Sequence, residues 1–376
     1  MQRVFKLGLL SGLMLAGSAA HANIEWSGFA NIGAGFTSGS DEQAFGYEDS
    51  VDFKPDTLFA LQGRAELADD LSITTQLMSR GEDNFDLGVE WAYLQYQVND
   101  AWTVNAGKLR LPLYNYSDSL DVAYSYHWLR TPQAVYRVPF DNFTGASVQH
   151  NAFLGDSMLS TQFIVGNFND SVEVADSQAE TDLENLVGLS SSLNYHSWTV
   201  RGGFFYSSDV SVELQTPEFN GLMMQLSGAG FASLADDLRV DEREGTFASI
   251  GLNFDNFDWV FASEYTELEV QDSFLAKQRS FYASLGKRFG SWMPHVTYAG
   301  TRDQQADFAL ATLPAPLAQG VQQLTSSTTQ RSNMTSLGVR YDVRAGVAFK
   351  FDVTHVDDKA LDTRSNVVSF SVQTVF

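Results

Sequence analysis

One long polar segment, residues 111–141, holds the side chains best suited to chemistry. It contains the acids Asp118 and Asp121, the basic residues Arg130 and Arg137, and many aromatic rings. Opposite charges in such a segment suit an electrostatic constriction, where acids on a loop face arginines on a surrounding wall and orient polar solutes. The basic residues expected on that wall are Arg64, Arg80, Arg201 and Arg340, with Lys350 as a further candidate. Alternatively, each arginine pairs with an acid on a neighbouring strand.

The sequence shows no residue pattern typical of an enzyme active site or of a metal site. The chain has no Cys, and no Ser lies in a nucleophile elbow. Histidines are scattered over different segments, with no two at metal-ligand spacing: His127, His150, His196, His295 and His355. We therefore expect no catalytic residue, no metal site and no bound cofactor.

Composition narrows the class of protein further. The 376 residues include 46 acidic and 23 basic side chains, which give a formal charge of -23. Such a field repels phosphate, so nucleic-acid binding is not expected. The mean hydropathy of -0.16 leaves no room for several apolar helices of membrane-spanning length.

The first 22 residues predict export from the cytosol. Arg3 and Lys6 precede an apolar run, and the segment ends in Ala20-His21-Ala22. This is the pattern of a secretory signal peptide, with the small residues that signal peptidase requires. The mature chain is then residues 23–376.

From Ile24 onward the apolar residues recur with a period of two, which predicts strands. Val368, Phe370 and Val372 share one face of the last segment, for example, whereas Ser369 and Ser371 share the other. Segmenting the chain in this way gives about sixteen strands, an even number. Short turns and long polar connections alternate between them, as at Gly290 (short) and in residues 169–182 and 208–245 (long). We therefore predict an all-β fold, a transmembrane antiparallel β-barrel with short periplasmic turns and long external loops.

A barrel of this size encloses a lumen too wide for side chains to fill, so something must narrow it. Residues 111–141 are the best candidate, because so many rings gain little in a solvated external loop but can pack against an inner wall. The alternative is that this loop caps the barrel or contacts another protomer.

These features resemble those of the Gram-negative outer-membrane porins. The resemblance rests on the signal peptide, the strand count, the long third loop and the terminal Phe376, and it covers the whole mature chain. Residues 107–112, Gly-Lys-Leu-Arg-Leu-Pro, also look like the strand-to-loop entry of porins related to the phosphate-selective type. Thr374 is a departure from the resemblance, because porins usually have a larger apolar or aromatic residue at this position of the last strand. The resemblance implies a homotrimer, contacts with lipopolysaccharide and membrane lipid, and recognition of Phe376 by the outer-membrane assembly machinery.

The expected function is passive diffusion of small hydrophilic solutes and ions through the outer membrane. One alternative is a substrate-selective channel, for anions or small organic molecules, in which Arg and Tyr residues of the constriction bind the solute. Another is a surface receptor or adhesin, with residues 208–245 and 302–333 as its working loops. Within the first of these, the apolar positions of residues 221–239 fit a short helix or an irregular loop equally well.

Overall fold

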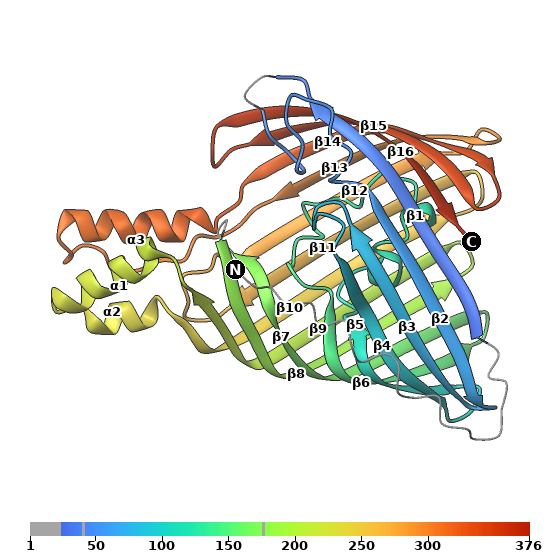
Figure 1. The fold of residues 1–376 in the computed structure, drawn as a ribbon, viewed down its shortest axis with the longest axis horizontal. Coiled ribbons are helices and arrows are strands. Elements are labelled where there is room, and N and C mark those ends of the chain that lie inside the picture. Colours follow the sequence, from blue (N-terminus) through green and yellow to red (C-terminus); the bar gives the residue numbers. More distant parts are fainter. Residues whose placement is uncertain (1–23, 40–41, 175–176) are drawn as a thin grey trace, which may run out of the picture.

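The computed structural model describes residues 24–39, 42–174 and 177–376. The predicted signal peptide, residues 1–22, lies outside the described residues. The described chain forms sixteen antiparallel strands that close into a single barrel (Figure 1). The strands are β1 (Ile24–Thr37), β2 (Leu58–Ala68), β3 (Leu71–Arg80), β4 (Leu87–Gln97), β5 (Trp102–Arg110), β6 (Asn142–Leu154), β7 (Ser157–Val174), β8 (Ser177–Tyr195), β9 (Trp198–Leu214), β10 (Val240–Asp255), β11 (Trp259–Val270), β12 (Gln278–Lys287), β13 (Trp292–Thr301), β14 (Ser332–Arg344), β15 (Val347–Asp358) and β16 (Thr363–Val375). The predicted fold class is confirmed.

Closure of the barrel depends on the two ends of the chain. β1 pairs with β16, and beyond the strand Phe376 N donates to Gly28 O while Gly28 N donates to Phe376 O, both at 2.9 Å. Every strand thus has two neighbours, so no sheet edge is left with unpaired backbone groups in hydrocarbon.

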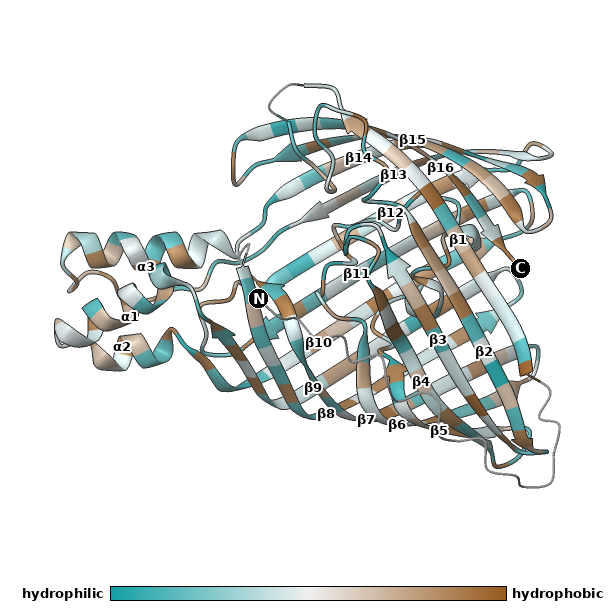
Figure 2. Ribbon diagram, viewed as in Figure 1, coloured by the Kyte–Doolittle hydropathy of each residue, from teal (hydrophilic) through white to brown (hydrophobic). Residues whose placement is uncertain are grey.

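The period-two pattern places apolar side chains outside the barrel. On β16, Phe370 and Val372 are 36% and 47% exposed, whereas Ser371 and Gln373 on the opposite face are fully buried. Figure 2 shows the resulting alternation of hydrophobic and hydrophilic residues along the strands. An exposed apolar outer face is stable only against lipid, so the outer surface is the membrane-facing one.

Aromatic residues mark the short-turn rim. Trp102, Trp198, Trp259 and Trp292 are the first residues of β5, β9, β11 and β13, and all four are exposed. Trp side chains at strand ends suit the interface between lipid and water. This rim is periplasmic.

Two predicted external loops are shorter than expected, because strands continue into them. Residues 169–182 and 208–245 were expected to be loops. In the structure β7 continues to Val174, β8 already begins at Ser177, and β9 continues to Leu214. The alternation persists there with acids such as Glu180 facing out and apolar residues such as Val212 facing in. Strands that rise above the membrane face water, so their composition resembles that of a loop.

The remaining external segments form a helical cap, made of α1 (Pro217–Gly228), α2 (Ala232–Asp237) and α3 (Ala315–Ser327). α1 begins after Thr216, whose side chain accepts a hydrogen bond from Phe219 N at 3.2 Å. Leu226 and Val321 are buried where the helices pack together. The sequence left residues 221–239 open between helix and irregular loop, and it did not predict α3.

Among the described residues, no helix is long and apolar enough to cross a membrane.

Candidate pore constriction

The third long connection, residues 111–141, is called L3 below. It links β5 to β6 and contains two short 3₁₀ turns, η1 (Ser117–Ser119) and η2 (Ala123–Ser125). In Figure 1 it lies inside the barrel. That residues 111–141 narrow the pore stays a prediction.

Aromatic packing holds L3 against the inner wall. Trp128 and Tyr126 are 2% and 6% exposed. The Trp128 ring meets Tyr282 of β12 edge to face at 5.5 Å between centroids, and it meets Tyr116 of L3 in the same way at 5.4 Å. Ring pairs of this geometry add to the stabilisation that burial supplies. These rings form a core inside the barrel, which the density of aromatic residues predicted.

Polar side chains of the wall complete this contact. Trp128 Nε1 donates to Thr297 Oγ1 at 2.8 Å and to Ser284 Oγ at 3.0 Å. His127 Nε2 lies 2.8 Å from the same Ser284 Oγ, and its ring lies 5.0 Å from that of His295. All of these groups are buried, so their hydrogen bonds fix L3 in place.

Two wall cations bind the backbone of L3 directly. Lys350 Nζ donates to the carbonyl oxygens of Ala123, Tyr126 and Trp128, each at 2.6 Å. Arg340 Nη1 donates to Tyr124 O at 2.7 Å and to Tyr126 O at 2.8 Å. Lys350 is fully buried. L3 has little regular secondary structure, so few of its carbonyl groups can pair with backbone N–H groups. These five hydrogen bonds supply donors to them instead.

The opposite side of L3 contacts strands β9 to β11. Arg201 Nη2 donates to Pro112 O at 2.6 Å, and Ser249 Oγ donates to Leu113 O at 2.7 Å. Glu264 of β11 accepts from Asn115 N and from the Tyr136 hydroxyl, both at 2.9 Å. L3 is therefore held from several sides and lies across the lumen.

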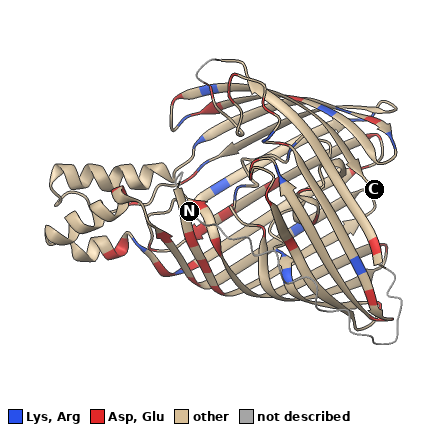
Figure 3. Cartoon of the chain, viewed as in Figure 1, with Lys and Arg blue, Asp and Glu red and all other residues tan. Residues whose placement is uncertain are grey.

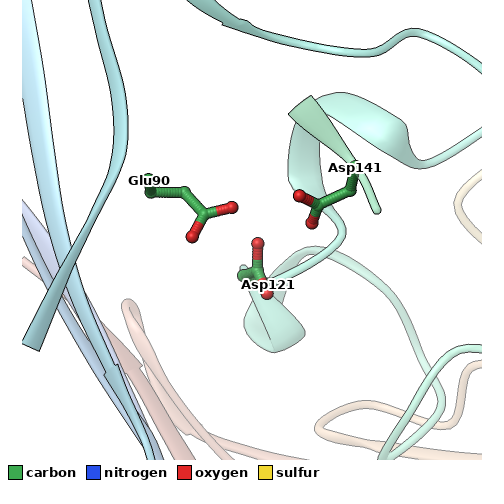
Figure 4. Close-up of side chains that lie close together, drawn as sticks. All are labelled: Glu90, Asp121 and Asp141. Carbon is green, nitrogen blue, oxygen red and sulfur yellow. The ribbon is translucent and has the colours of Figure 1, made fainter. Parts of the chain in front are cut away.

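A third group of contacts forms an acid cluster of Glu90, Asp121 and Asp141, together with Arg80 and Arg110. Figure 4 shows the three carboxylates pointing toward one another. Their oxygens are close enough to hold a metal ion, but two guanidinium groups already lie among them. Arg80 is 3.1 Å from Glu90 and 3.0 Å from Asp121, and Arg110 pairs with Asp121 and Asp141 and is 3.5 Å from Glu90. Three acids and two arginines leave a net charge of one negative unit.

The two loop acids of this cluster differ in acidity. Burial opposes ionisation of Asp121, but Arg110 and Arg80 more than offset it and hold the pKa of this carboxyl below its usual value. Asp141 accepts from Arg110 and, at 3.4 Å, from Asn142 Nδ2, and burial raises the pKa of Asp141 to about 6, with Asp121 and Glu90 adding repulsion. Of the two loop acids, Asp141 therefore accepts a proton first.

The remaining loop arginines tie L3 to other external segments. Arg130 pairs with Asp56, with Nε 3.0 Å from Oδ1, and Arg137 pairs with Asp303, with Nη1 3.0 Å from Oδ2. Both acids lie in connections next to the barrel mouth, before β2 and after β13. Within the described chain, these pairs neutralise the two loop arginines locally.

The eight charged residues expected at the constriction thus have distinct positions. Arg80, Asp121, Arg130 and Arg137 form ion pairs, and Arg201 and Arg340 bind the backbone of L3. Asp118 is exposed on L3, and Arg64 lies away from L3 with Nη1 3.1 Å from Gln95 Oε1. We expected acids on the loop to face arginines on the wall and to set up a field across the constriction, and that field stays a prediction. Asp121 of L3 does meet Arg80 of the wall, because L3 reaches the wall and buried charges need partners.

Several residues of the site were missed from the sequence, and Glu90 shows why. The pairing of β3 with β4 shifts register between Gln76↔Trp91 and Leu77↔Val89, so Glu90 is the extra residue of a β-bulge. The bulge turns both Glu90 and Trp91 inward, as their contacts with Arg80 and Gln62 show. Counting by alternate residues cannot detect this shift.

No protein-family model and no curated protein matches the chain. Solved structures do. The outer membrane channel DcaP of Acinetobacter baumannii superposes with a TM-score of 0.58 at 13% identity, over 96% of this chain and 100% of that one. An anion-selective porin from Comamonas acidovorans gives 0.58 at 8% identity, over 94% and 100%. The trimer form of OmpT, an outer membrane protein of Vibrio cholerae, gives 0.53 at 11% identity, over 94% and 99%.

The chain has the porin fold. The likeness extends over nearly the whole described barrel, so the porin fold accounts for the strand number and the alternation of short turns and long loops. At these identities it carries no information about individual side chains. A closed barrel with an apolar outer face is a form in which β1 to β16 can cross a membrane.

Proposed function

We propose that the chain is a passive diffusion channel for small hydrophilic solutes and ions in the outer membrane. The observation that carries this proposal is L3, which lies across the lumen of a closed barrel and is bound to β12, β13, β14 and β15 on one side and to β9, β10 and β11 on the other. A wide aqueous lumen narrowed by a fixed loop passes solutes according to size and charge. No energy source is required.

Liposome swelling tests this proposal directly. Vesicles that contain the purified protein are diluted into isotonic sugars of increasing size, and the rate of swelling is recorded. We expect fast swelling in small monosaccharides and a steep decline for trisaccharides. Equal rates with and without protein, for a barrel whose band shifts on heating in gels, would overturn the channel proposal.

The helical cap favours a receptor or adhesin as a second candidate function. Phe274 and Leu226 are fully buried and Val321 nearly so, so these external segments have a core of their own above the membrane. Replacing residues 217–237 and 308–327 with short Gly-Ser linkers should then abolish binding to a ligand or cell while conductance stays intact. Lost conductance with retained binding would contradict this candidate.

We also propose a homotrimer with lipopolysaccharide and membrane lipid around it, and Phe376 as the signal read by the assembly machinery. The trimer form of the Vibrio cholerae neighbour and the position of Phe376 at the closing seam support this. Cross-linking in native outer membranes should yield a species of three chains. Phe376→Ala should lower the amount of folded barrel there, and an unchanged amount would remove the assembly role.

A further inference from the structure

The inner wall of the barrel changes character from one end to the other on β8 and β9. Toward the periplasm its inward side chains are polar, such as Ser190 and Arg201. Toward the outside they become apolar, with Leu186, Phe205 and Val210 all buried. A wall that faces only water has no need of such residues.

Part of this apolar wall encloses a cavity of about 400 Å³. The external halves of β7 to β12 form its sides, with Val172, Val212 and Leu268 among them, and L3 forms its floor with Leu113 and Phe140. We call it the apolar vestibule. Its volume and its mostly apolar lining with a few hydrogen-bonding groups are those of a site for a small organic molecule.

The lining itself carries little net charge. Arg137 borders the apolar vestibule, but its guanidinium is held by both carboxylate oxygens of Asp303 and by Gln330. Glu173 also borders the apolar vestibule, whereas other polar groups at the lining, such as Thr181 and Gln278, are neutral. A bound solute therefore meets apolar surface, neutral hydrogen-bonding groups and the carboxylate of Glu173.

The rim around the apolar vestibule is strongly acidic. The external halves of β7 to β10 carry many acids and few bases, and Figure 3 shows acidic residues gathered at these strand ends. The acids are Asp170, Glu173, Glu180, Asp182, Glu184, Asp209, Glu213, Asp241, Glu242 and Glu244, against Arg243 alone among the bases of the same strand segments. Such a field raises the local concentration of cations and lowers that of anions.

We infer that the apolar vestibule binds small organic cations that have an aromatic or aliphatic body. The body replaces water against Val172, Val210 and Leu268, and the ammonium group stays hydrated near the acidic rim. This inference rests on the proposed function, because it names a class of solute that the channel holds before the constriction. Simple hydrophilic solutes pass the same vestibule without being retained.

Isothermal titration with defined probes tests the inference on the purified full-length barrel in detergent micelles. Phenethylammonium is compared with ethylammonium, which lacks the ring, and with phenylacetate, which reverses the charge. Empty micelles correct for partition of the ring into detergent. We expect phenethylammonium to bind at least about tenfold more tightly than ethylammonium, since burying a ring removes several apolar carbons from water. We expect the same margin over phenylacetate, since the acidic rim repels a carboxylate. Phenylacetate binding as tightly as phenethylammonium would overturn the charge preference.

Two variants locate the site. Leu268→Gln introduces an amide into the lining. Val210→Thr replaces a methyl group with a hydroxyl without changing the shape of the side chain, and it serves as the test if Leu268→Gln fails to fold. Both should weaken phenethylammonium binding, whereas Leu361→Gln, in an external connection and 74% exposed, should leave it unchanged. Binding unaffected by both lining variants would overturn the inference. Binding needs no ion flow, so a barrel that binds the probe but carries no current would contradict only the proposed channel.

Discussion

Arg340 of β14 and Lys350 of β15 lie directly opposite each other in the sheet register, and both donate to the Tyr126 carbonyl of L3. Like charges at paired positions destabilise a sheet unless something compensates them. Here the carbonyl oxygens of Ala123, Tyr124, Tyr126 and Trp128 receive the two cations. The pair therefore acts as a clamp that ties L3 to the wall.

Removing the lysine of the clamp should loosen L3. Lys350→Met keeps the length of the side chain but leaves the carbonyls of Ala123 and Trp128 without this donor, at a cost of about 1–3 kcal/mol for each that stays unsatisfied, whereas the Tyr126 carbonyl keeps Arg340. We expect faster trypsin cleavage after Arg130 and Arg137 in the folded barrel, measured by mass spectrometry. The control Lys359→Met removes a half-exposed lysine paired with Asp357. Equal cleavage rates in both variants would show that Lys350 does not hold the loop.

Arg110 should matter more for stability than an exposed arginine. Its guanidinium is 8% exposed and serves three acids, so Arg110→Met should cost about 3–5 kcal/mol. Arg288→Met breaks an exposed pair with Asp255 and should cost about 0–1 kcal/mol. The measurement is the temperature at which the folded band disappears in gels. A smaller loss for Arg110 than for Arg288 would contradict the role of the acid cluster.

The acid cluster should also make ion selectivity depend on pH. The pKa of Asp141 is raised to about 6, so above that pH the cluster carries one net negative charge and below it none. Cation preference should fall as the pH drops from 7.5 to 5, read from the reversal potential in a salt gradient. Asp141→Asn should remove this step. A step of the same size in that variant would assign it to another group.

The closing seam should tolerate no side chain at Gly28. A Cβ atom there would lie 2.6 Å from the Phe376 ring and 2.7 Å from the backbone oxygen of Ala60 in β2, so Gly28→Ala must displace both neighbours. Overpacking of this kind costs about 1–3 kcal/mol. Gly202→Ala is the matched control, because its Cβ meets nothing closer than 3.8 Å. Heat-resistance of the folded band should fall for the first variant only, and equal values would contradict the seam geometry.

The fold could be predicted because alternation depends on neighbouring residues alone. Lipid favours apolar side chains on the outer face of a barrel, and a wet lumen favours polar side chains on the inner face. Val372 therefore faces outward and its neighbour Gln373 faces inward. The position of L3 could also be predicted, since rings such as Trp128 gain nothing in water. Where the hairpins rise above the membrane the alternation persists, but polar residues such as Glu180 face outward and apolar residues such as Val212 face inward, so these strands were predicted as loops.

The partners within the site could not be predicted. Asp56 meets Arg130 and Asp303 meets Arg137 across 74 and 166 residues of sequence, and those contacts depend on how loops fold. His127 and His295, scattered in the sequence, come together for the same reason. Of the wall cations, Arg201, Arg340 and Lys350 were placed on the lumen side by alternation, but nothing in the sequence showed that they bind L3 carbonyls.

The central claim is that a fixed L3 narrows an open channel. Single-channel current across a planar lipid bilayer tests it, with wild type and Lys350→Met compared in the same salt. We predict discrete conductance steps for wild type, in groups of three if the trimer proposal holds, and larger or noisier steps for the variant. A folded wild-type barrel that passes no current, or a variant with identical steps, would contradict the account.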